Sequence, residues 1–421
     1  MKHKLFPVAL LLLVACNQNP NNTNDEKMNY PQTRMDNTVD TYFGTQVSDP
    51  YRWLEDDRSA ETAQWVKAQN DFTFGYLSKI PYRQAIKEKL EKLWNYEKLS
   101  APFTEGDYTY YYKNDGLQNQ SVLYRKDKEG KEEIFLNPNT FSKDGTTSLG
   151  DVAFSEDGSL VAYLISEGGS DWRKGIVLDA KTKKAIGDTL VDIKFSSVAW
   201  KGNEGFFYSS YDKPKGSELS AKTDQHKLYY HKLGTSQKSD KLIFGGTPTE
   251  KYRYVSGTVS NDGKYLFISV ANATSGNKLF VKDLSNPKSS LVTITNNFDG
   301  DTGFVNNQGT TLFLETNINA PNGRLVKVDF KNPQPEHWQD VIPETKNVLS
   351  ITTAGKYLFA KYMVDALSQV KQYDYEGKLI REVKLPSIGS AGGFYAKKDE
   401  THTYFSFTNY AYPTQIYKMD L

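Results

Sequence analysis

The stretch SNDGKYLFI, residues 260–268, contains the pattern that decides the fold. A short polar turn ends at Gly263 and leads directly into a strand-like run, Tyr265-Leu266-Phe267-Ile268. Glycine adopts positive φ at little cost, and aromatic or branched residues favour strands. The stretch therefore predicts a tight turn followed by a β-strand, and backbone geometry rather than phosphate binding explains the glycine.

The same unit recurs along most of the chain. Six such turns end in glycine, and a seventh polar turn, residues 397–400, lacks one. A strand-like run follows every turn, and successive turns are 45 to 58 residues apart. Several strands within a period of this length are typical of a β-propeller. We therefore predict an all-β, seven-bladed β-propeller over residues 98–421, with glycine turns at Gly106, Gly158, Gly205, Gly263, Gly309 and Gly355.

Each blade is expected to contain about four strands. Three strong strands are predicted in the second period, at residues 152–154, 160–166 and 175–179. A weaker fourth strand is predicted near Ile186. In the seventh period three strands are predicted, at residues 393–396, 402–408 and 415–419. The sequence then ends at Leu421, so we expect an incomplete last blade without its fourth strand.

Residues 30–97 differ from the repeats and favour short helices. Apolar residues follow one helical stripe between Ala60 and Leu77 and a second stripe between Tyr82 and Trp94. This short segment also contains three tryptophans, Trp53, Trp65 and Trp94. So large an apolar surface is expected to be buried. It could pack against the domain that follows, or against a domain that this chain does not contain.

Residues 1–15 read as a signal peptide, because two lysines precede an apolar run that is too short to span a membrane. Cys16, the only cysteine, ends the run Leu13-Val14-Ala15-Cys16, which resembles the bacterial lipoprotein cleavage box. We expect a lipid on Cys16, a disordered tether over residues 16–29, and a periplasmic or cell-envelope lipoprotein. The alternative is an ordinary cleaved signal peptide with an incidental cysteine.

Composition and motifs argue against several classes of function. The 52 Lys and Arg against 51 Asp and Glu leave a net charge of +1, so nucleic acid is not an expected partner. The single cysteine excludes a multi-cysteine metal site, and neither a metal nor a cofactor is expected. His226 and His231 are expected on opposite faces of a strand, at the surface or in turns. The sequence contains no G-x-S-x-G, Walker or H-E-x-x-H motif, so no catalytic residue is expected in this chain.

From about residue 30 onward, the chain resembles the prolyl oligopeptidase (prolyl endopeptidase) family of serine peptidases, which cleave after proline in short peptides. Together the motifs that carry this resemblance are highly specific. They are DPYRWLED (49–56), WVKAQN (65–70), GLQNQSVLY (116–124), GSDW (169–172), KFSSVAW (194–200) and QHKLYYHKLGT (225–235).

The resemblance implies an enzyme built from a seven-bladed propeller and an α/β-hydrolase domain. In the family, a short N-terminal helical segment and a long C-terminal stretch form the hydrolase domain, and that stretch carries the catalytic Ser, Asp and His. It would begin after residue 421, so the resemblance implies the substrate-filtering half of a bacterial secreted peptidase, and enzyme activity of this chain alone stays uncertain. Its expected partners are short proline-containing peptides and the missing hydrolase domain, with membrane contact only through a lipid anchor. The alternative is a stand-alone peptide- or protein-binding propeller lipoprotein without catalysis.

The resemblance also implies one substrate-binding residue, Phe195. In the family, a phenylalanine in the strand that matches residues 194–196 reaches the proline-recognition site. From the residues alone, a core aromatic of a blade is the simpler interpretation of Phe195. The family's animal enzymes also have an Arg and a Cys in the loop that matches residues 271–274, which here reads ANAT. Peptide contacts in that loop are therefore in doubt.

Overall fold

The computed structural model describes residues 28–421 except 188, 215–218, 220 and 249–250. The chain divides into two compact units, of which the first ends at Gln84 and the second spans Ala85–Leu421. Residues 1–15 and Cys16 lie outside the described residues. Among the described residues, no helix has both the length and the apolar character needed to cross a membrane.

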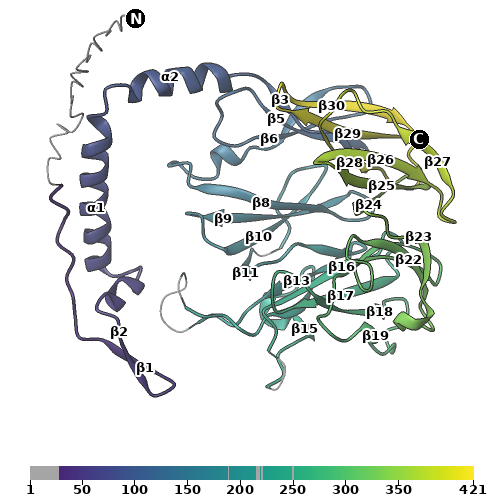
Figure 1. Ribbon diagram of the computed structural model, residues 1–421, viewed down its shortest axis with the longest axis horizontal. Helices are drawn as coiled ribbons and strands as arrows, with labels where there is room; N and C mark the ends of the chain where they lie inside the picture. Colours follow the sequence, from purple (N-terminus) through teal and green to yellow (C-terminus); the bar gives the residue numbers. More distant parts are fainter. Residues whose placement is uncertain (1–27, 188, 215–218, 220, 249–250) are drawn as a thin grey trace, which may run out of the picture. The chain divides into compact units, whose positions relative to one another are not determined.

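The first unit contains a β-hairpin, a 3-10 turn and one long helix (Figure 1). These elements are β1 (Val39–Tyr42), β2 (Thr45–Ser48), η1 (Arg52–Glu55) and α1 (Ala60–Ser78). Ser59 caps α1, because its hydroxyl accepts a hydrogen bond from the backbone N–H of Thr62 at 3.0 Å. The helix is therefore confirmed, whereas the sequence analysis did not predict the hairpin.

Residues just before the hairpin cover part of the tryptophan-rich surface of this unit. The Trp65 indole N–H donates to Thr33 Oγ1 at 2.9 Å. The Trp53 indole N–H donates to the carbonyl oxygen of Arg34 at 2.9 Å, and the guanidinium of Arg34 lies 4.7 Å from the Trp53 ring centroid. Trp53 and Trp65 thus have local partners. Sequence analysis did not predict this local cover, because nothing in the sequence indicates that an extended segment folds back onto α1, and packing of the remaining surface on another domain stays a prediction.

Helix α2 (Arg83–Trp94) leaves its apolar stripe uncovered. Four of its large apolar side chains are each about half exposed or more, namely Ile86, Leu90, Leu93 and Trp94. The predicted second helix is therefore confirmed, and its stripe remains a candidate contact surface.

The second unit is a seven-bladed β-propeller, as predicted (Figure 1). Within each blade the strands are antiparallel and hydrogen-bonded in chain order. The first strands of neighbouring blades contact one another, for example β20 with β24 and β24 with β28, so these strands line the centre.

Blade 1 consists of β3 (Lys98–Leu99), β4 (Phe103–Glu105), β5 (Tyr108–Asn114), β6 (Val122–Lys126) and β7 (Glu132–Leu136). Blade 2 consists of β8 (Thr147–Phe154), β9 (Leu160–Glu167), β10 (Trp172–Asp179) and β11 (Leu190–Lys194). Blade 3 consists of β12 (Ala199–Lys201), β13 (Gly205–Ser210), β14 (Lys227–Lys232) and β15 (Lys241–Phe244). Blade 4 consists of β16 (Tyr254–Val259), β17 (Tyr265–Ala271), β18 (Asn277–Asp283) and β19 (Val292–Thr295).

Blade 5 consists of β20 (Thr302–Gln308), β21 (Thr311–Thr316), β22 (Arg324–Asp329) and β23 (Gln339–Ile342). Blade 6 consists of β24 (Val348–Ala354), β25 (Tyr357–Val364), β26 (Leu367–Tyr373) and β27 (Leu379–Val383). Blade 7 consists of β28 (Ser390–Tyr395), β29 (His402–Asn409) and β30 (Tyr412–Asp420). Three short 3-10 turns, η2 (Pro138–Thr140), η3 (Gln237–Ser239) and η4 (Pro335–His337), lie between strands.

The predicted turn-and-strand unit corresponds to the first and second strands of each blade. All seven predicted strands after the turns are confirmed, and five of the six turn glycines have φ between 56° and 71°. Gly205 is the exception, because it begins β13 and Gly202, with φ 50°, occupies the turn. Gly205 is nevertheless needed as glycine, since a Cβ there would lie 2.1 Å from the carbonyl oxygen of His231.

The fourth strand of blade 2 is Leu190–Lys194, so its predicted position near Ile186 was wrong. The backbone N–H of Ile186 does donate to Val177 at 2.8 Å, but this bond belongs to the turn that precedes the strand. Continuous pairing resumes only with Leu190 opposite Gly175. In blade 7, the three predicted strands are confirmed, and β30 forms the outer edge among the described residues.

Buried aromatic and aliphatic side chains join the blades to one another. Six apolar clusters each combine two consecutive blades, from blades 1 and 2 through blades 6 and 7. Phe267 of blade 4 stacks on Phe304 of blade 5 at 3.9 Å, and Phe359 of blade 6 stacks on Phe394 of blade 7 at 5.3 Å. The high aromatic content of the sequence therefore supplies the interfaces between blades.

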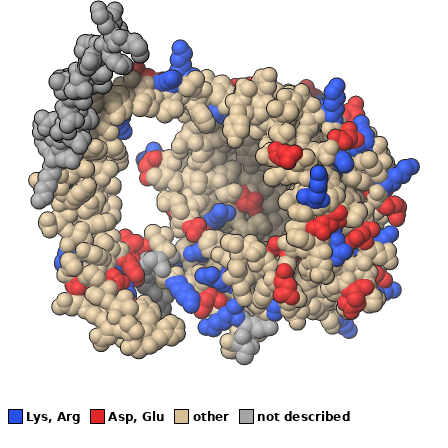
Figure 2. Space-filling view, viewed as in Figure 1, with Lys and Arg blue, Asp and Glu red and all other residues tan. Residues whose placement is uncertain are grey.

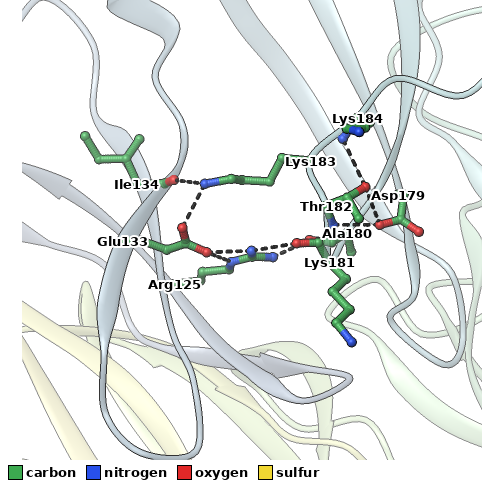
Figure 3. Close-up of polar contacts among 9 residues, drawn as sticks. All are labelled: Arg125, Glu133, Ile134, Asp179, Ala180, Lys181, Thr182, Lys183 and Lys184. Carbon is green, nitrogen blue, oxygen red and sulfur yellow. Dashed lines mark hydrogen bonds and ion pairs between the residues drawn. The ribbon is translucent and has the colours of Figure 1, made fainter.

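A polar contact reinforces the interface between blades 1 and 2 (Figure 3). Arg125, which is 2% exposed, donates from Nε to Glu133 at 2.7 Å and from a terminal nitrogen to the carbonyl oxygen of Lys181 at 3.1 Å. Its other terminal nitrogen donates to the carbonyl oxygen of Ala180. Lys183 of blade 2 also donates to Glu133 at 2.8 Å, so one carboxylate of blade 1 holds two cations.

The interface between blades 7 and 1 is different in kind. Among the described residues, no buried apolar cluster spans it. The contact found there is an ion pair, in which Lys397 Nζ lies 2.6 Å from Glu105 Oε2. Burial raises the pKa of Glu105, and the neighbouring Lys397 opposes that shift.

Candidate functional site

Phe195 lies in the linker between the last strand of blade 2 and the first strand of blade 3. Adjacent strands of a blade run in opposite directions, so these linkers and the loops between second and third strands lie on the same face of the propeller. We call this the linker face. Phe195 is 44% exposed and belongs to no buried cluster, so it is not a core aromatic of a blade.

Two tyrosines from other parts of the linker face surround Phe195. Tyr254 begins the first strand of blade 4, and its ring centroid lies 5.8 Å from that of Phe195. Tyr211 follows β13 of blade 3, and its ring lies 6.2 Å from Phe195 in an edge-to-face arrangement. Tyr254 is 42% exposed, whereas Tyr211 is buried. Phe195 and Tyr254 therefore present two adjacent exposed rings on a buried aromatic support.

The backbone at Phe195 is strained. Its φ is 49°, in the left-handed region that costs a residue with a side chain roughly 1–2 kcal/mol. Such a conformation persists only where the surroundings impose it. At Phe195 this backbone conformation accompanies an exposed ring, and hydrogen bonds from a neighbouring residue hold the conformation in place.

His226 fixes the backbone beside both exposed rings. Its Nδ1 accepts the backbone N–H of Val255 at 2.8 Å, so Nε2 carries the proton and donates to the carbonyl oxygen of Lys194 at 2.9 Å. Val255 follows Tyr254, and Lys194 precedes Phe195. Burial lowers the pKa of His226 to about 4, so the ring is neutral near pH 7. The expectation of a surface histidine was wrong, because both ring nitrogens are used inside the propeller.

Lys194 contributes a cation beneath the exposed ring. Its side chain is buried, and Nζ lies 5.3 Å from the ring centroid of Phe195 and 4.8 Å from that of Trp172. A cation over an aromatic face is attracted by the ring quadrupole. Lys194 therefore helps to fix the orientation of Phe195.

His231 is also buried, contrary to the sequence-based expectation. Its Nδ1 lies 2.8 Å from Asp240 Oδ1, and the Tyr208 hydroxyl donates to the other oxygen of that carboxylate at 2.8 Å. The described residues contain no group of three or more His, Cys, Asp or Glu side chains arranged to hold a metal. The network around His231 thus satisfies buried polar groups within blade 3.

Tyr211 and Tyr254 were not predicted as site residues, because no local pattern marks them and they come from different blades. The loop at residues 271–274 lies near this group, since Asn272 Oδ1 accepts the backbone N–H of Arg253 at 3.1 Å. Figure 2 shows a hollow at the centre of one propeller face, with basic and acidic side chains mixed around it. That mixture agrees with the near-zero net charge.

Comparison with known proteins identifies the family. Residues 30–421 match the family model described as prolyl oligopeptidase, N-terminal beta-propeller domain. The chain is 56% identical to the prolyl endopeptidase of Elizabethkingia miricola and 54% identical to that of Elizabethkingia meningoseptica. Each match covers 100% of this chain and 59% of the relative, so the chain spans about three fifths of the length of these curated relatives.

A solved structure shows the same fold. Prolyl oligopeptidase B from Galerina marginata, bound to a 25mer macrocyclization substrate, superimposes with a TM-score of 0.82 at 28% identity. That match covers 93% of this chain and 59% of the other protein. The family resemblance of the sequence motifs is thereby confirmed: the chain belongs to the prolyl oligopeptidase family and corresponds to its N-terminal β-propeller region.

Proposed function

We propose that this propeller serves a prolyl endopeptidase by admitting short proline-containing peptides, which an α/β-hydrolase domain then cleaves. The observation that carries the proposal is the pair of exposed rings, Phe195 and Tyr254, beside backbone that His226 holds by two hydrogen bonds. The relatives named prolyl endopeptidase match the chain along its whole length. That match favours this function over a stand-alone binding propeller.

Phe195 is the substrate-binding residue in this proposal. The proline ring is rigid and apolar, and proline-rich segments dock on aromatic surfaces because little conformational entropy is lost on binding. Two rings whose centroids are 5.8 Å apart offer such a surface. The backbone hydrogen bonds made by His226 would hold that surface in place before the peptide arrives, which lowers the cost of binding.

The hydrolase domain is the proposed partner of α2. Ile86, Leu90, Leu93 and Trp94 form an apolar stripe that is exposed in this chain. Exposed stripes of this kind mark surfaces that contact another protein or domain. The relatives extend well beyond the region that this chain matches, which supports a catalytic domain as the occupant.

Cys16 is the proposed lipid anchor of an exported protein. The proposal rests on the run Leu13-Val14-Ala15-Cys16 directly after an apolar leader. Because one acyl chain binds a membrane only marginally, stable attachment needs at least two. A Cys16→Ser variant should leave the membrane fraction or remain unprocessed, and equal membrane retention of that variant would reject the anchor.

Peptide binding tests the role of Phe195. Binding of a short proline-containing peptide to the full chain should weaken roughly tenfold in Phe195→Ala, equivalent to about 1.4 kcal/mol. Tyr410→Ala is the matched control, because Tyr410 is a fully exposed aromatic side chain at the β29–β30 turn. Equal loss in both variants, or no loss in Phe195→Ala, would contradict the proposal.

Hydrolysis assays test whether the propeller admits peptides while a separate hydrolase domain cleaves them. The chain alone should not cleave a proline-containing chromogenic peptide, because its sequence contains no G-x-S-x-G nucleophile motif. Adding the part of the Elizabethkingia miricola enzyme that lies beyond the match should produce cleavage. Turnover by the chain alone that a serine reagent abolishes would refute this assignment.

A further inference from the structure

A second feature of the propeller lies away from Phe195. A cavity of about 520 Å³ runs along the first strands of blades 5 and 6, and Tyr395 of blade 7 lies on its rim. Ligand cavities typically enclose about 300–1,000 Å³. The cavity lies beside the centre of the propeller, because β20 and β24 are first strands. It is therefore large enough for a small organic molecule.

One carboxylate dominates the polar part of this cavity. Glu315 of β21 pairs with Gly303 of β20, so the two residues share the face that lines the cavity. Glu315 Oε2 accepts the backbone N–H of Ile351 in blade 6 at 2.9 Å. Among the described residues this is its sole hydrogen bond, so Oε1 has no protein partner.

Asp301 also lines the cavity, but both of its oxygens are already used. Oδ1 accepts the backbone N–H of Gly276 at 2.7 Å, and Oδ2 accepts from Asn317 Nδ2 at 3.2 Å. None of the described lining residues is basic. The cavity thus has a negative electrostatic character, and Glu315 is the lining carboxylate with an oxygen free to bind a ligand.

The surroundings of Glu315 partly disfavour its ionised form. Burial raises the pKa of Glu315, and both the hydrogen bond from the Ile351 N–H and the charge of Lys361 oppose that shift. A cation bound beside the carboxylate would favour its ionised form. The apolar part of the lining includes Val305, which packs on the apolar cluster of blades 5 and 6, and the exposed side chain of Val348.

We propose that this cavity binds an organic cation, namely a primary ammonium or guanidinium group on a short apolar body, with the Glu315 carboxylate as its counter-ion. The charged group would bind Glu315 Oε1, and the apolar body would lie against Val305 and Val348. The amino terminus of a peptide, a basic peptide side chain and a free amine share this chemistry. The proposal is independent of Phe195, since the two sites lie on different blades.

The test uses phenethylammonium as the probe, with calorimetric titration into the full chain. Glu315→Gln should weaken binding roughly tenfold or more, because hydrogen bonds to charged groups are the strong ones. The amide oxygen of Gln can still accept the Ile351 N–H, so the fold should be retained. Glu336→Gln, at an exposed glutamate of η4 outside the cavity, is the matched control and should bind as the unmodified chain does.

A second variant blocks the space rather than the charge. A Cβ at Gly303 meets nothing within 4 Å, and its φ lies outside the left-handed region, so Gly303→Leu should fill the cavity without backbone strain. Gly75→Leu is the matched control, because Gly75 in α1 has the same properties and lies away from the cavity. Gly303→Leu should abolish probe binding, and Gly75→Leu should not.

Competition identifies the source of the cation. A peptide with a free amino terminus, its N-acetylated form and an N-acetylated peptide that contains lysine are each titrated against bound probe. Competition by the peptide with a free amino terminus, by the lysine peptide, or by free amines alone is consistent with the proposal and names the natural ligand, whereas equal competition by the N-acetylated form of the first peptide would contradict it. The proposal is overturned if the probe does not bind at millimolar concentration, if its neutral analogue 2-phenylethanol binds equally well, or if Glu315→Gln binds it unchanged. Phe195→Ala should leave probe binding intact, which separates this result from failure of the proposed peptide function.

Discussion

Replacing the buried Arg125 by methionine should destabilise the propeller clearly more than replacing an exposed lysine of the same contact network. The guanidinium is almost completely buried between blades 1 and 2, and the Tyr108 ring centroid lies 4.0 Å from it. Methionine retains much of the apolar stem of the arginine and adapts to irregular space. The substitution therefore isolates the loss of the charged, hydrogen-bonding group.

The magnitude follows from what remains after the substitution. The carbonyl oxygens of Ala180 and Lys181 lose a charged donor, and hydrogen bonds to charged groups contribute about 1.5–3 kcal/mol each. Glu133 is 42% exposed and keeps Lys183, so it is hydrated rather than left buried and unpaired. The cost should therefore lie near the lower end of the 3–5 kcal/mol typical of broken buried pairs, at about 3 kcal/mol.

Urea unfolding of the full chain, followed by tryptophan fluorescence and circular dichroism, measures this cost. Lys183→Met is the control, because Lys183 donates to the same carboxylate from a more exposed position, and it should cost less than about 1 kcal/mol. Equal costs for the two variants, or a cost below about 1 kcal/mol for Arg125→Met, would refute the reasoning that burial makes this contact strong.

Three further predictions concern other parts of the propeller. His226 has a folded-state pKa of about 4, below its ordinary 6.5, so the stability that its neutral form contributes above pH 6.5 is lost as the pH falls towards 4. From pH 7 to pH 4, the free energy of unfolding of the unmodified chain should therefore fall by about 3 kcal/mol more than that of His226→Gln. Parallel pH profiles of the two proteins would contradict this prediction. Gly158→Ala should lower the free energy of unfolding by clearly more than the roughly 1–2 kcal/mol expected for Gly234→Ala. Both glycines have positive φ, but of these two only Gly158 would place a Cβ 2.2 Å from another backbone atom. Equal melting temperatures of the two variants would reject this prediction. Lys397→Met should destabilise the chain by less than about 1 kcal/mol at low salt, because Lys397 is half exposed. At 1 M NaCl it should hardly destabilise the chain, because salt screens the attraction between Lys397 and Glu105. A loss of stability that does not depend on salt would rule out the ion pair as its cause.

The architecture could be predicted from sequence because its signals are local. A turn glycine such as Gly263 and the strand after it lie within ten residues, and the period repeats seven times. Features that depend on a distant segment could not be predicted. Trp65 is covered by a segment 32 residues earlier, and the fourth strand of blade 2 begins only where Leu190 comes into register with Gly175.

The candidate sites were less predictable for the same reason. Phe195 was identified through a family motif, but its partner Tyr254 lies 59 positions later and joins it only through blade-to-blade packing. The buried state of His226 depends on a carbonyl 32 residues before it and an N–H 29 residues after it. Glu315 resembles any other strand glutamate until the neighbouring blade places a backbone N–H beside it.

Among the residues that the structure describes, six apolar clusters join consecutive blades and an ion pair joins blades 7 and 1. This arrangement determines how cooperativity is distributed around the ring. Nearest-neighbour coupling between repeats makes such a molecule approximate a linear array. Within the described part of the chain, blades 2 to 6 each share two apolar interfaces, whereas blades 1 and 7 each share one. Local opening should therefore require least free energy at the two ends of the array, and amide protection should increase from them towards blade 4. Although the blades form a ring, their stability should therefore vary as in a linear array, lowest in blades 1 and 7 and highest near blade 4.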